Sequence, residues 1–184
     1  MKDLSLNLLD IAENSVKAGA TLTQLLLTQE GDILTFQVAD DGCGMTEEIL
    51  KGVVDPFYTT RTTRKVGMGL PLLRMAAEQT GGTMEVESRH VDSHPDNHGT
   101  TVTAVFHTDH IDCPPVGDMV ATVTTLIQGH PDTDFLFRHA DGETVVELDT
   151  RQLREVLGEV SLAEYEVLQW ISGYLTDQYN GQQA

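Results

Sequence analysis

Two short glycine-containing motifs constrain the fold and function of this chain more than any other feature of its sequence. The first, Asp40-Asp41-Gly42-Cys43-Gly44, comes directly after a run of alternating apolar residues that is typical of a half-buried strand. A carboxylate followed by two glycines lets the backbone approach a flat ligand while the Asp accepts a hydrogen bond from an amino group. The second motif, Gly67-Met68-Gly69-Leu70, stands at the start of a predicted helix, where free N–H groups suit a phosphate. Glycine turns before helices are common, so the order and spacing of the motifs carry more weight than either motif alone.

The first predicted helix, over residues 4–18, carries a polar stripe that precedes these motifs. Its apolar residues recur with helical spacing, and polar residues on another face lie one and two turns apart. These polar residues are Asp10, Glu13, Asn14 and Lys17. A solvated face with an ion pair is the ordinary explanation of such a stripe. Its last residue, Lys17, stands 23 residues before Asp40, and this position favours a functional site instead.

The remaining pattern predicts alternating strands and helices in two parts of the chain. The strands are expected at 21–29, 33–38, 83–88, 100–107, 134–139 and 143–149. Further helices are expected from Thr46, over 68–80, from Met119 to Gly129, and twice near the C-terminus, the last opened by Ser161-Leu-Ala-Glu164. Cys113-Pro114-Pro115 predicts a boundary between a domain at 1–111 and a small α+β module at 112–184. The module has 3 basic and 13 acidic residues, a net charge of −10, and its role is unknown.

The motifs resemble, in type, order and spacing, those of the GHKL superfamily of ATP-binding domains. That superfamily includes gyrase B, the heat-shock chaperone ATPase, MutL and the sensor histidine kinases. Residues 8–17 resemble its N box, 40–45 its G1 box, 55–61 its F box, 65–72 its G2 box and 99–103 its closing strand. The resemblance covers about residues 3–108. It implies a two-layer α/β sandwich of the Bergerat type, with a mixed sheet and helices on one face, followed by the small C-terminal α+β module.

The resemblance also implies how ATP and Mg²⁺ would be held. Asn14 would ligate the Mg²⁺ that bridges the triphosphate, as a neutral oxygen ligand beside phosphates, and Lys17 would neutralise phosphate charge. Gly67, Gly69 and Leu70 would wrap the phosphates as a lid closes. Lys65 departs from the family pattern, because a glycine is usual at that position. Either a stiffer lid or direct contact of Lys65 with phosphate would follow.

The base and the chemistry would depend on a second group of residues. Asp40 would bind the adenine amino group, with Gly42 and Gly44 giving clearance for the base and Thr100 supporting Asp40 through water. Asp10 is the candidate catalytic residue, because a carboxylate one turn before the Mg²⁺ ligand could polarise water or a protein hydroxyl.

The resemblance implies an ATP-dependent protein kinase of histidine-kinase-like or anti-sigma Ser/Thr type, acting on a partner protein in bacterial signalling or regulation. Two alternatives stay open. One is a non-catalytic switch in which ATP orders the lid and so changes a protein interface, and the other is a slow ATPase. The N box begins within ten residues of Met1, so we expect a stand-alone domain without a dimerisation or phosphoacceptor segment.

Charge and composition exclude several partners. The net charge is −18, which argues against a nucleic acid and against an anionic membrane surface. No apolar run reaches the ~20 residues of a membrane span, and the N-terminus lacks a signal peptide. Two cysteines are too few for a disulfide framework. We therefore expect a soluble cytoplasmic protein with a protein partner, and a homodimer stays open.

Three further features receive ordinary explanations. His90, His94 and His98 are interrupted by Pro95, which favours a solvated loop over a metal site. Cys43 is expected to be a small buried apolar residue. Trp170, Ile171 and Tyr174 are expected to lie in the core of the C-terminal module.

Overall fold

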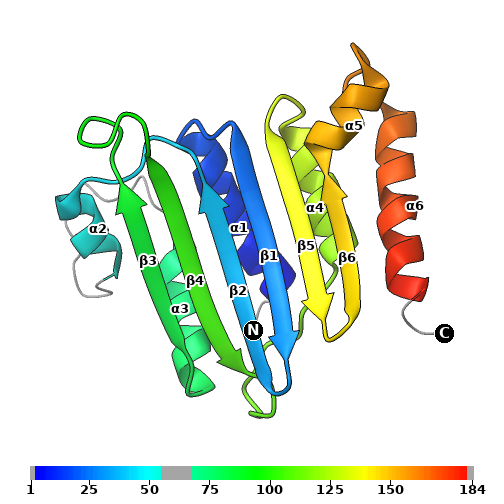
Figure 1. The fold of residues 1–184 in the computed structure, drawn as a ribbon. Helices are drawn as coiled ribbons and strands as arrows, with labels where there is room; N and C mark the ends of the chain where they lie inside the picture. Colours follow the sequence, from blue (N-terminus) through cyan, green and yellow to red (C-terminus); the bar gives the residue numbers. More distant parts are fainter. Residues whose placement is uncertain (1–2, 55–67, 182–184) are drawn as a thin grey trace.

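A six-stranded mixed sheet, with the strand order β3-β4-β2-β1-β5-β6, organises the molecule (Figure 1). The computed structural model describes residues 3–54 and 68–181. The strands are β1 (Leu22–Glu30), β2 (Ile33–Asp40), β3 (Thr83–Arg89), β4 (Gly99–His107), β5 (Asp134–Asp141) and β6 (Thr144–Asp149). Neighbouring strands are antiparallel except β1 and β5, which are parallel. The sheet is therefore mixed, as predicted.

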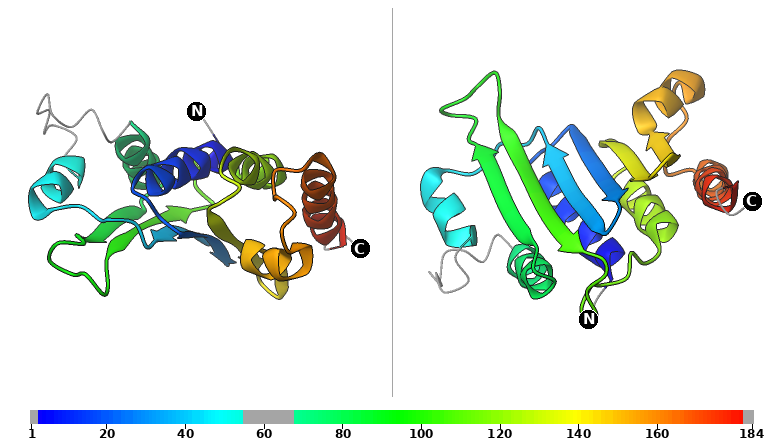
Figure 2. Two further views of the ribbon diagram at one scale, coloured as in Figure 1. Left: turned by 90° about the horizontal axis from the view of Figure 1, so that it is seen from above. Right: turned by 60° about the horizontal axis from the view of Figure 1, so that its bottom comes forward.

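The described residues also form helices, and those that lie on one face of the sheet make up the second layer. The helices are α1 (Leu4–Lys17), α2 (Glu47–Val54), α3 (Gly69–Gln79), α4 (Met119–Gly129), α5 (Thr150–Leu157) and α6 (Tyr165–Gly181). Figure 2 shows α1, α3 and α4 side by side on one face of the sheet. This confirms the predicted two-layer sandwich with helices on one face.

Helix α1 is fixed at both of its ends by groups outside the helix. The Asp3 side chain caps its N-terminus by accepting a hydrogen bond from the Leu6 N–H. The N–H groups of Leu4 and Ser5 donate to backbone carbonyls at 115 and 116. At the other end, the carbonyl of Ala18 accepts a hydrogen bond from the Cys43 N–H at 2.9 Å. The segment that follows β2 is therefore attached to the C-terminal end of α1.

Strand β2 places Asp40 beneath α1. Its buried residues Leu34, Phe36 and Val38 alternate along the strand and face the helices. Asp40 continues this alternation, so its side chain points to the same face at the end of the strand. Opposite Asp40 in the pairing of β2 with β4 stands Thr100. The strand register alone brings these two predicted site residues together.

The C-terminal part of the chain extends the same sheet. Strand β5 pairs with the central strand β1, and β6 forms the edge. The side chain of Gln178 in α6 bonds to both backbone groups of Glu147 in β6, through N–H to Oε1 at 3.0 Å and Nε2 to the carbonyl at 3.1 Å. These bonds satisfy part of the exposed edge. The domain boundary expected at 111/112 stays a prediction. Strands from both sides of it belong to the same sheet.

Two expectations about α6 are wrong. Ser161 does not cap the helix; its Oγ accepts from the Ala163 N–H in a turn that precedes Tyr165, the first helical residue. Trp170 and Tyr174 are not core residues, since their exposed fractions are 52% and 41%. Ile171 is buried, as expected, and it shares the buried face of α6 with Leu168 and Leu175. The i, i+3 and i+7 spacing of these residues turns Trp170 and Tyr174 outward.

Candidate functional site

A cavity of about 460 Å³ opens among α1, the loop before α2, the start of α3, and strands β2 and β4. Six residues predicted from sequence line it, namely Asn14, Lys17, Asp40, Gly44, Leu70 and Thr100. The rest of the lining is mainly apolar, from Ile11, Val38, Met45, Ile49 and Val102. An apolar cavity with a few convergent polar groups is typical of a small-molecule site.

The carboxylate of Asp40 is held by three hydrogen-bond donors. Its Oδ2 accepts from the Ser15 hydroxyl at 2.6 Å. Its Oδ1 accepts from the backbone N–H groups of Gly42 at 2.9 Å and Thr100 at 3.2 Å. Donors from the helix, the loop and the neighbouring strand therefore fix the orientation of one carboxylate at the cavity.

Ser15 is the site residue that sequence reasoning missed. It belongs to the apolar side of α1 by spacing, and it is 3% exposed. A buried hydroxyl needs a hydrogen-bond partner, and Ser15 finds it in Asp40. A polar residue within an otherwise apolar helix stripe was the available signal.

A second set of hydrogen bonds surrounds Thr100. Its backbone N–H donates to Asp40 Oδ1 at 3.2 Å, and the expected support through water stays a prediction. Its hydroxyl lies 2.7 Å from the Ser88 hydroxyl in β3. The Ser88 hydroxyl in turn accepts from the Met45 N–H at 2.7 Å. The loop after β2 is thereby joined to both β3 and β4.

The two glycines of the first motif are required by contacts within the protein. A Cβ atom on Gly42 would lie 2.9 Å from the Ala18 Cβ and 3.1 Å from Asp40 Oδ1. Gly44 has a φ of +70°, and a Cβ there would lie only 2.0 Å from the Arg89 carbonyl oxygen. No side chain fits between this loop and its neighbours, whether or not a ligand is present.

Two neighbours of these glycines behave differently from each other. Cys43 was expected to be buried, but its side chain is exposed and lines the cavity, because its N–H and carbonyl are the groups that bond to Ala18 and Val91. Asp41 points away and accepts hydrogen bonds from Thr21 and Leu22. Partial burial alone would raise the pKa of Asp41, but these hydrogen bonds outweigh burial and lower its pKa.

The other predicted residues take different places around the cavity. Asn14 and Lys17 line it from α1. Asp10, one turn earlier, lies against the first residue of α3, since a Cβ on Gly69 would be 3.3 Å from the Asp10 Cβ. Lys65 and Gly67 lie outside the described residues, as do Arg61 and Arg64.

The donor set suits a hydrated Mg²⁺ better than a tightly coordinated metal. Magnesium in nucleotide sites takes one or two protein oxygens and completes its shell with water and phosphate, and the Asn14 amide at the cavity could supply one such oxygen. In the described residues, no three His, Cys, Asp or Glu side chains group as metal ligands. His90, His94 and His98 lie in the loop between β3 and β4, where Nδ1 of His98 is 2.5 Å from the Gly42 carbonyl. A helix able to span a membrane is likewise absent from residues 3–54 and 68–181.

Comparisons with known proteins agree with this arrangement. Residues 2–110 match the family of histidine kinase-, DNA gyrase B- and HSP90-like ATPases. The sensor histidine kinase CitA of Klebsiella pneumoniae is 32% identical over 85 residues, 45% of this chain and 16% of the relative. Sporulation kinase A of Bacillus subtilis is 30% identical over 106 residues, 58% of this chain and again 16% of the relative. The chain thus spans about a sixth of the length of these kinases.

A solved structure extends the likeness beyond the matched region. The ATPase domain of Aquifex aeolicus MutL, complexed with ADP, superposes with a TM-score of 0.53 over 80% of this chain and 65% of that domain, at 15% identity. At this identity the likeness concerns the fold alone. The family match covers more than half of the chain, and it covers the helix, strands and loops that form the cavity. The chain therefore belongs to the family of histidine kinase-, DNA gyrase B- and HSP90-like ATPases.

Proposed function

We propose that this chain binds ATP with Mg²⁺ in the cavity of about 460 Å³ and transfers the γ-phosphoryl group to a partner protein. The observation that carries the binding proposal is the Asp40 carboxylate, which three donors orient at an otherwise apolar cavity. A carboxylate accepts hydrogen bonds only, so it selects a ligand with a donor such as the adenine amino group. Guanine carries an oxygen at the corresponding position and would be repelled.

The two ends of the cavity match the two ends of a nucleotide. Val38, Val102 and Ile49 would pack against the flat base, while Asn14 and Lys17 on α1 would meet the phosphates. Mg²⁺, when bound, would offset the charge of the triphosphate, with Asn14 as its protein ligand. Leu70 and Gly69, at the start of α3, would approach the phosphates through free N–H groups.

The proposal of phosphoryl transfer is supported by the relatives and by Asp10. The curated relatives are kinases by name, and Asp10 lies one helical turn from Asn14, beside the start of α3. In this scheme the bond between the γ-phosphorus and the bridging oxygen breaks, and a partner hydroxyl or imidazole becomes phosphorylated. Asp10 accepts the proton that the nucleophile loses, and ADP leaves.

Incubation with γ-labelled ATP tests the proposal. The purified chain would be mixed with the products of neighbouring genes, and label on protein would be compared with free phosphate. We expect label on a partner protein, and a loss of 10²- to 10⁴-fold in transfer for Asp10→Asn with ATP affinity retained. Asp92→Asn, an exposed carboxylate in the β3–β4 loop, is the matched control.

The other outcomes separate the alternatives. Free phosphate without labelled protein would identify a slow ATPase. ATP binding with neither transfer nor release would identify a switch. Both results would reject phosphoryl transfer while leaving the nucleotide site intact.

A further inference from the structure

Helix α6 presents two aromatic rings to solvent on its outer face. Leu168, Ile171 and Leu175 are buried on its inner face, which packs toward β6 and α4. Trp170 and Tyr174 lie on the other side, and their rings stack with centroids 4.8 Å apart and an interplanar angle of 12°. A stacked aromatic pair that remains half exposed on a well-packed helix is unusual for a surface without a partner, because Trp and Tyr are the residues most enriched at the centres of interfaces.

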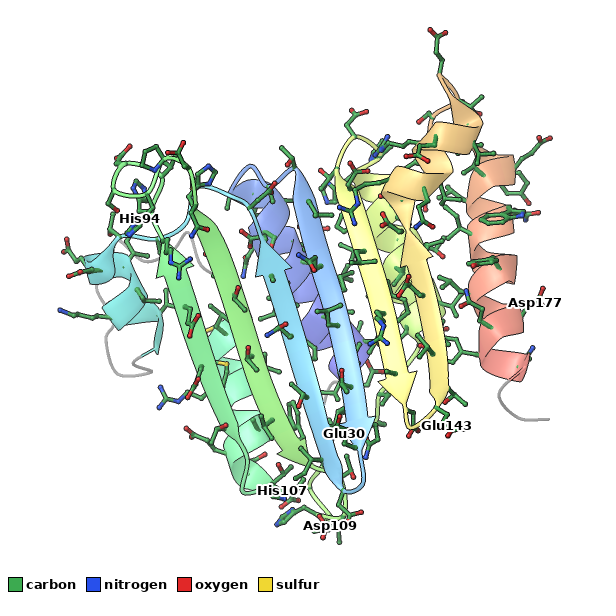
Figure 3. All side chains as sticks on the ribbon, viewed as in Figure 1. Glu30, His94, His107, Asp109, Glu143 and Asp177 are labelled. Atoms are coloured by element: carbon green, nitrogen blue, oxygen red, sulfur yellow. The ribbon has the colours of Figure 1, made fainter. Side chains whose placement is uncertain are left out.

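Two carboxylates flank the aromatic pair. Glu166 is one turn before Trp170, and Asp177 is two turns after it, so all four side chains fall within an arc of about 80° around the helix. Figure 3 shows Asp177 on the side of α6 that faces away from the sheet. Glu166 and Asp177 are exposed, and neither forms an ion pair with another described residue. We call Glu166, Trp170, Tyr174 and Asp177 the α6 outer face.

The chemistry of this face selects its occupant. Exposed aromatic rings attract Lys and Arg through cation–π contacts and also pack against apolar side chains. The two carboxylates attract positive charge. We infer that the α6 outer face docks a cationic amphipathic segment of a partner protein, one that presents Lys or Arg beside apolar residues. This inference concerns where a partner docks and does not depend on what happens to ATP.

Charge argues against the other occupants. A second copy of this chain carries a net charge of −18 and would bring the same carboxylates against these, which is repulsive. Anionic lipid headgroups and nucleic acids are repelled for the same reason. A basic segment would be attracted both by Glu166 and Asp177 and by the net negative charge of the whole chain.

The position of the face suits a docking site. Helix α6 lies beyond the β6 edge of the sheet, whereas α2 and the cavity lie toward the β3 edge (Figure 1). A partner on α6 would leave the cavity open. The two hydrogen bonds between Gln178 and the backbone of Glu147 fix the helix to the sheet, so the face is formed before binding.

Trp170 is the single tryptophan of the chain and therefore reports on its own surroundings. The full chain would be titrated with a synthetic helical peptide of Leu and Lys that lacks aromatic residues, while the Trp emission is recorded. We expect a saturable blue shift, because the indole becomes less exposed to water. A peptide with Glu in place of Lys should produce no shift at the same concentrations.

Variants separate this site from diffuse attraction to an acidic protein. With a fluorescein-labelled Leu/Lys peptide, anisotropy should give at least tenfold weaker binding for Tyr174→Ala and for Glu166→Gln/Asp177→Asn. Met75→Ala, an exposed apolar residue on α3, is the control and should bind as the wild type does. The Glu166→Gln/Asp177→Asn variant removes charge but no packing contacts. It therefore still tests the inference if Tyr174→Ala does not fold.

Three results would overturn the inference. They are the absence of a saturable shift with the Leu/Lys peptide, equal binding by all the variants, and a dimer of the wild type that sedimentation shows to dissociate in Trp170→Ala. The last result would identify a second copy as the occupant.

Discussion

At the scale of single residues, the site depends on how one carboxylate is oriented. Asp40 is reached by donors from three different parts of the chain, and only one of them, the Ser15 hydroxyl, is a side chain. The two backbone donors follow from the register of β2 with β4 and from the turn at Gly42. Ser15 is therefore the point at which this arrangement can be changed without altering the backbone.

Replacement of Ser15 by alanine is expected to weaken ATP binding about tenfold while the fold is retained. A hydrogen bond to a charged group contributes about 1.5–3 kcal/mol, and its loss frees one oxygen of Asp40 to reorient. Calorimetric titration with ATP measures the effect. Ser93→Ala, in the exposed β3–β4 loop, is the control and should bind ATP with unchanged affinity. Unchanged affinity in Ser15→Ala would reject the orienting role.

Some residues of the cavity could be predicted from the sequence, and others could not. Asp40 and Thr100 were predictable, because a carboxylate after a buried strand and a Gly-Thr pair are visible patterns. The role of Ser15 was predictable only in part: a serine within an apolar stripe signals a buried hydroxyl, but only the strand beneath the helix shows that its partner is Asp40. Cys43 was assigned to the core by residue type, but the bonds of its own backbone turn its side chain into the cavity.

At the scale of elements, the loop after β2 is held against β3 with no space between them. The N–H of Val91 donates to the Cys43 carbonyl at 2.8 Å, and the Met45 N–H donates to the Ser88 hydroxyl. Gly44 lies at the closest approach. The sequence predicted each of these elements but not this contact, because the contact joins segments more than 40 residues apart.

Two glycines of similar backbone conformation provide a matched test of that contact. Gly44 has a φ of +70° and Gly31, in the β1–β2 turn, a φ of +58°, but only at Gly44 would a Cβ meet backbone atoms. Gly31→Ala should lower the free energy of unfolding by about 1–2 kcal/mol, the cost of a left-handed alanine. Gly44→Ala should cost at least about 2 kcal/mol more, because the loop must separate from β3. Urea unfolding measures both, and equal losses would show that the contact is not tight.

In helix α6, near the C-terminus, the prediction from hydrophobic periodicity was partly wrong. The periodicity of α6 predicted a single apolar face that includes Trp170 and Tyr174. Of the aromatic and aliphatic residues expected there, the helix buries Ile171, together with Leu168 and Leu175, because β6 and α4 lie on that side. Hydrophobicity alone could not distinguish an outward aromatic pair from a buried one.

At the scale of the whole molecule, a partly buried polar contact joins the last helix to the sheet. His139 Nδ1 in β5 lies 2.9 Å from the Tyr179 hydroxyl in α6. Burial lowers the pKa of His139, and Asp141 offsets only part of that effect. Burial also raises the pKa of Tyr179 well above its usual range. Both groups are therefore neutral at pH 7, and which of them donates the hydrogen bond depends on the imidazole tautomer.

This contact predicts a loss of stability on mild acidification. In the unfolded chain His139 takes up a proton near its ordinary pKa of 6.5, whereas the folded chain does so only at lower pH. Below pH 6.5 the unfolded state binds more protons, so the free energy of unfolding falls from there down to the lowered pKa. Urea unfolding at pH 7.5 and 5.5 should show this loss in the wild type and a smaller loss in His139→Gln. His94→Gln, in an exposed loop, should keep the wild-type dependence; an identical slope in His139→Gln would contradict the account.

Calorimetric titration of the wild type and of Asp40→Asn with ATP and GTP, in the presence of Mg²⁺, measures whether Asp40 selects adenine. We expect one site on the wild type with a preference for ATP. Asp40→Asn should lose a factor of about ten to one hundred in ATP affinity, because one hydrogen bond to a charged acceptor contributes about 1.5–3 kcal/mol. It should also lose the preference for ATP over GTP. Equal affinity of the wild type for the two nucleotides, or an Asp40→Asn variant that binds ATP as the wild type does, would contradict the proposed site.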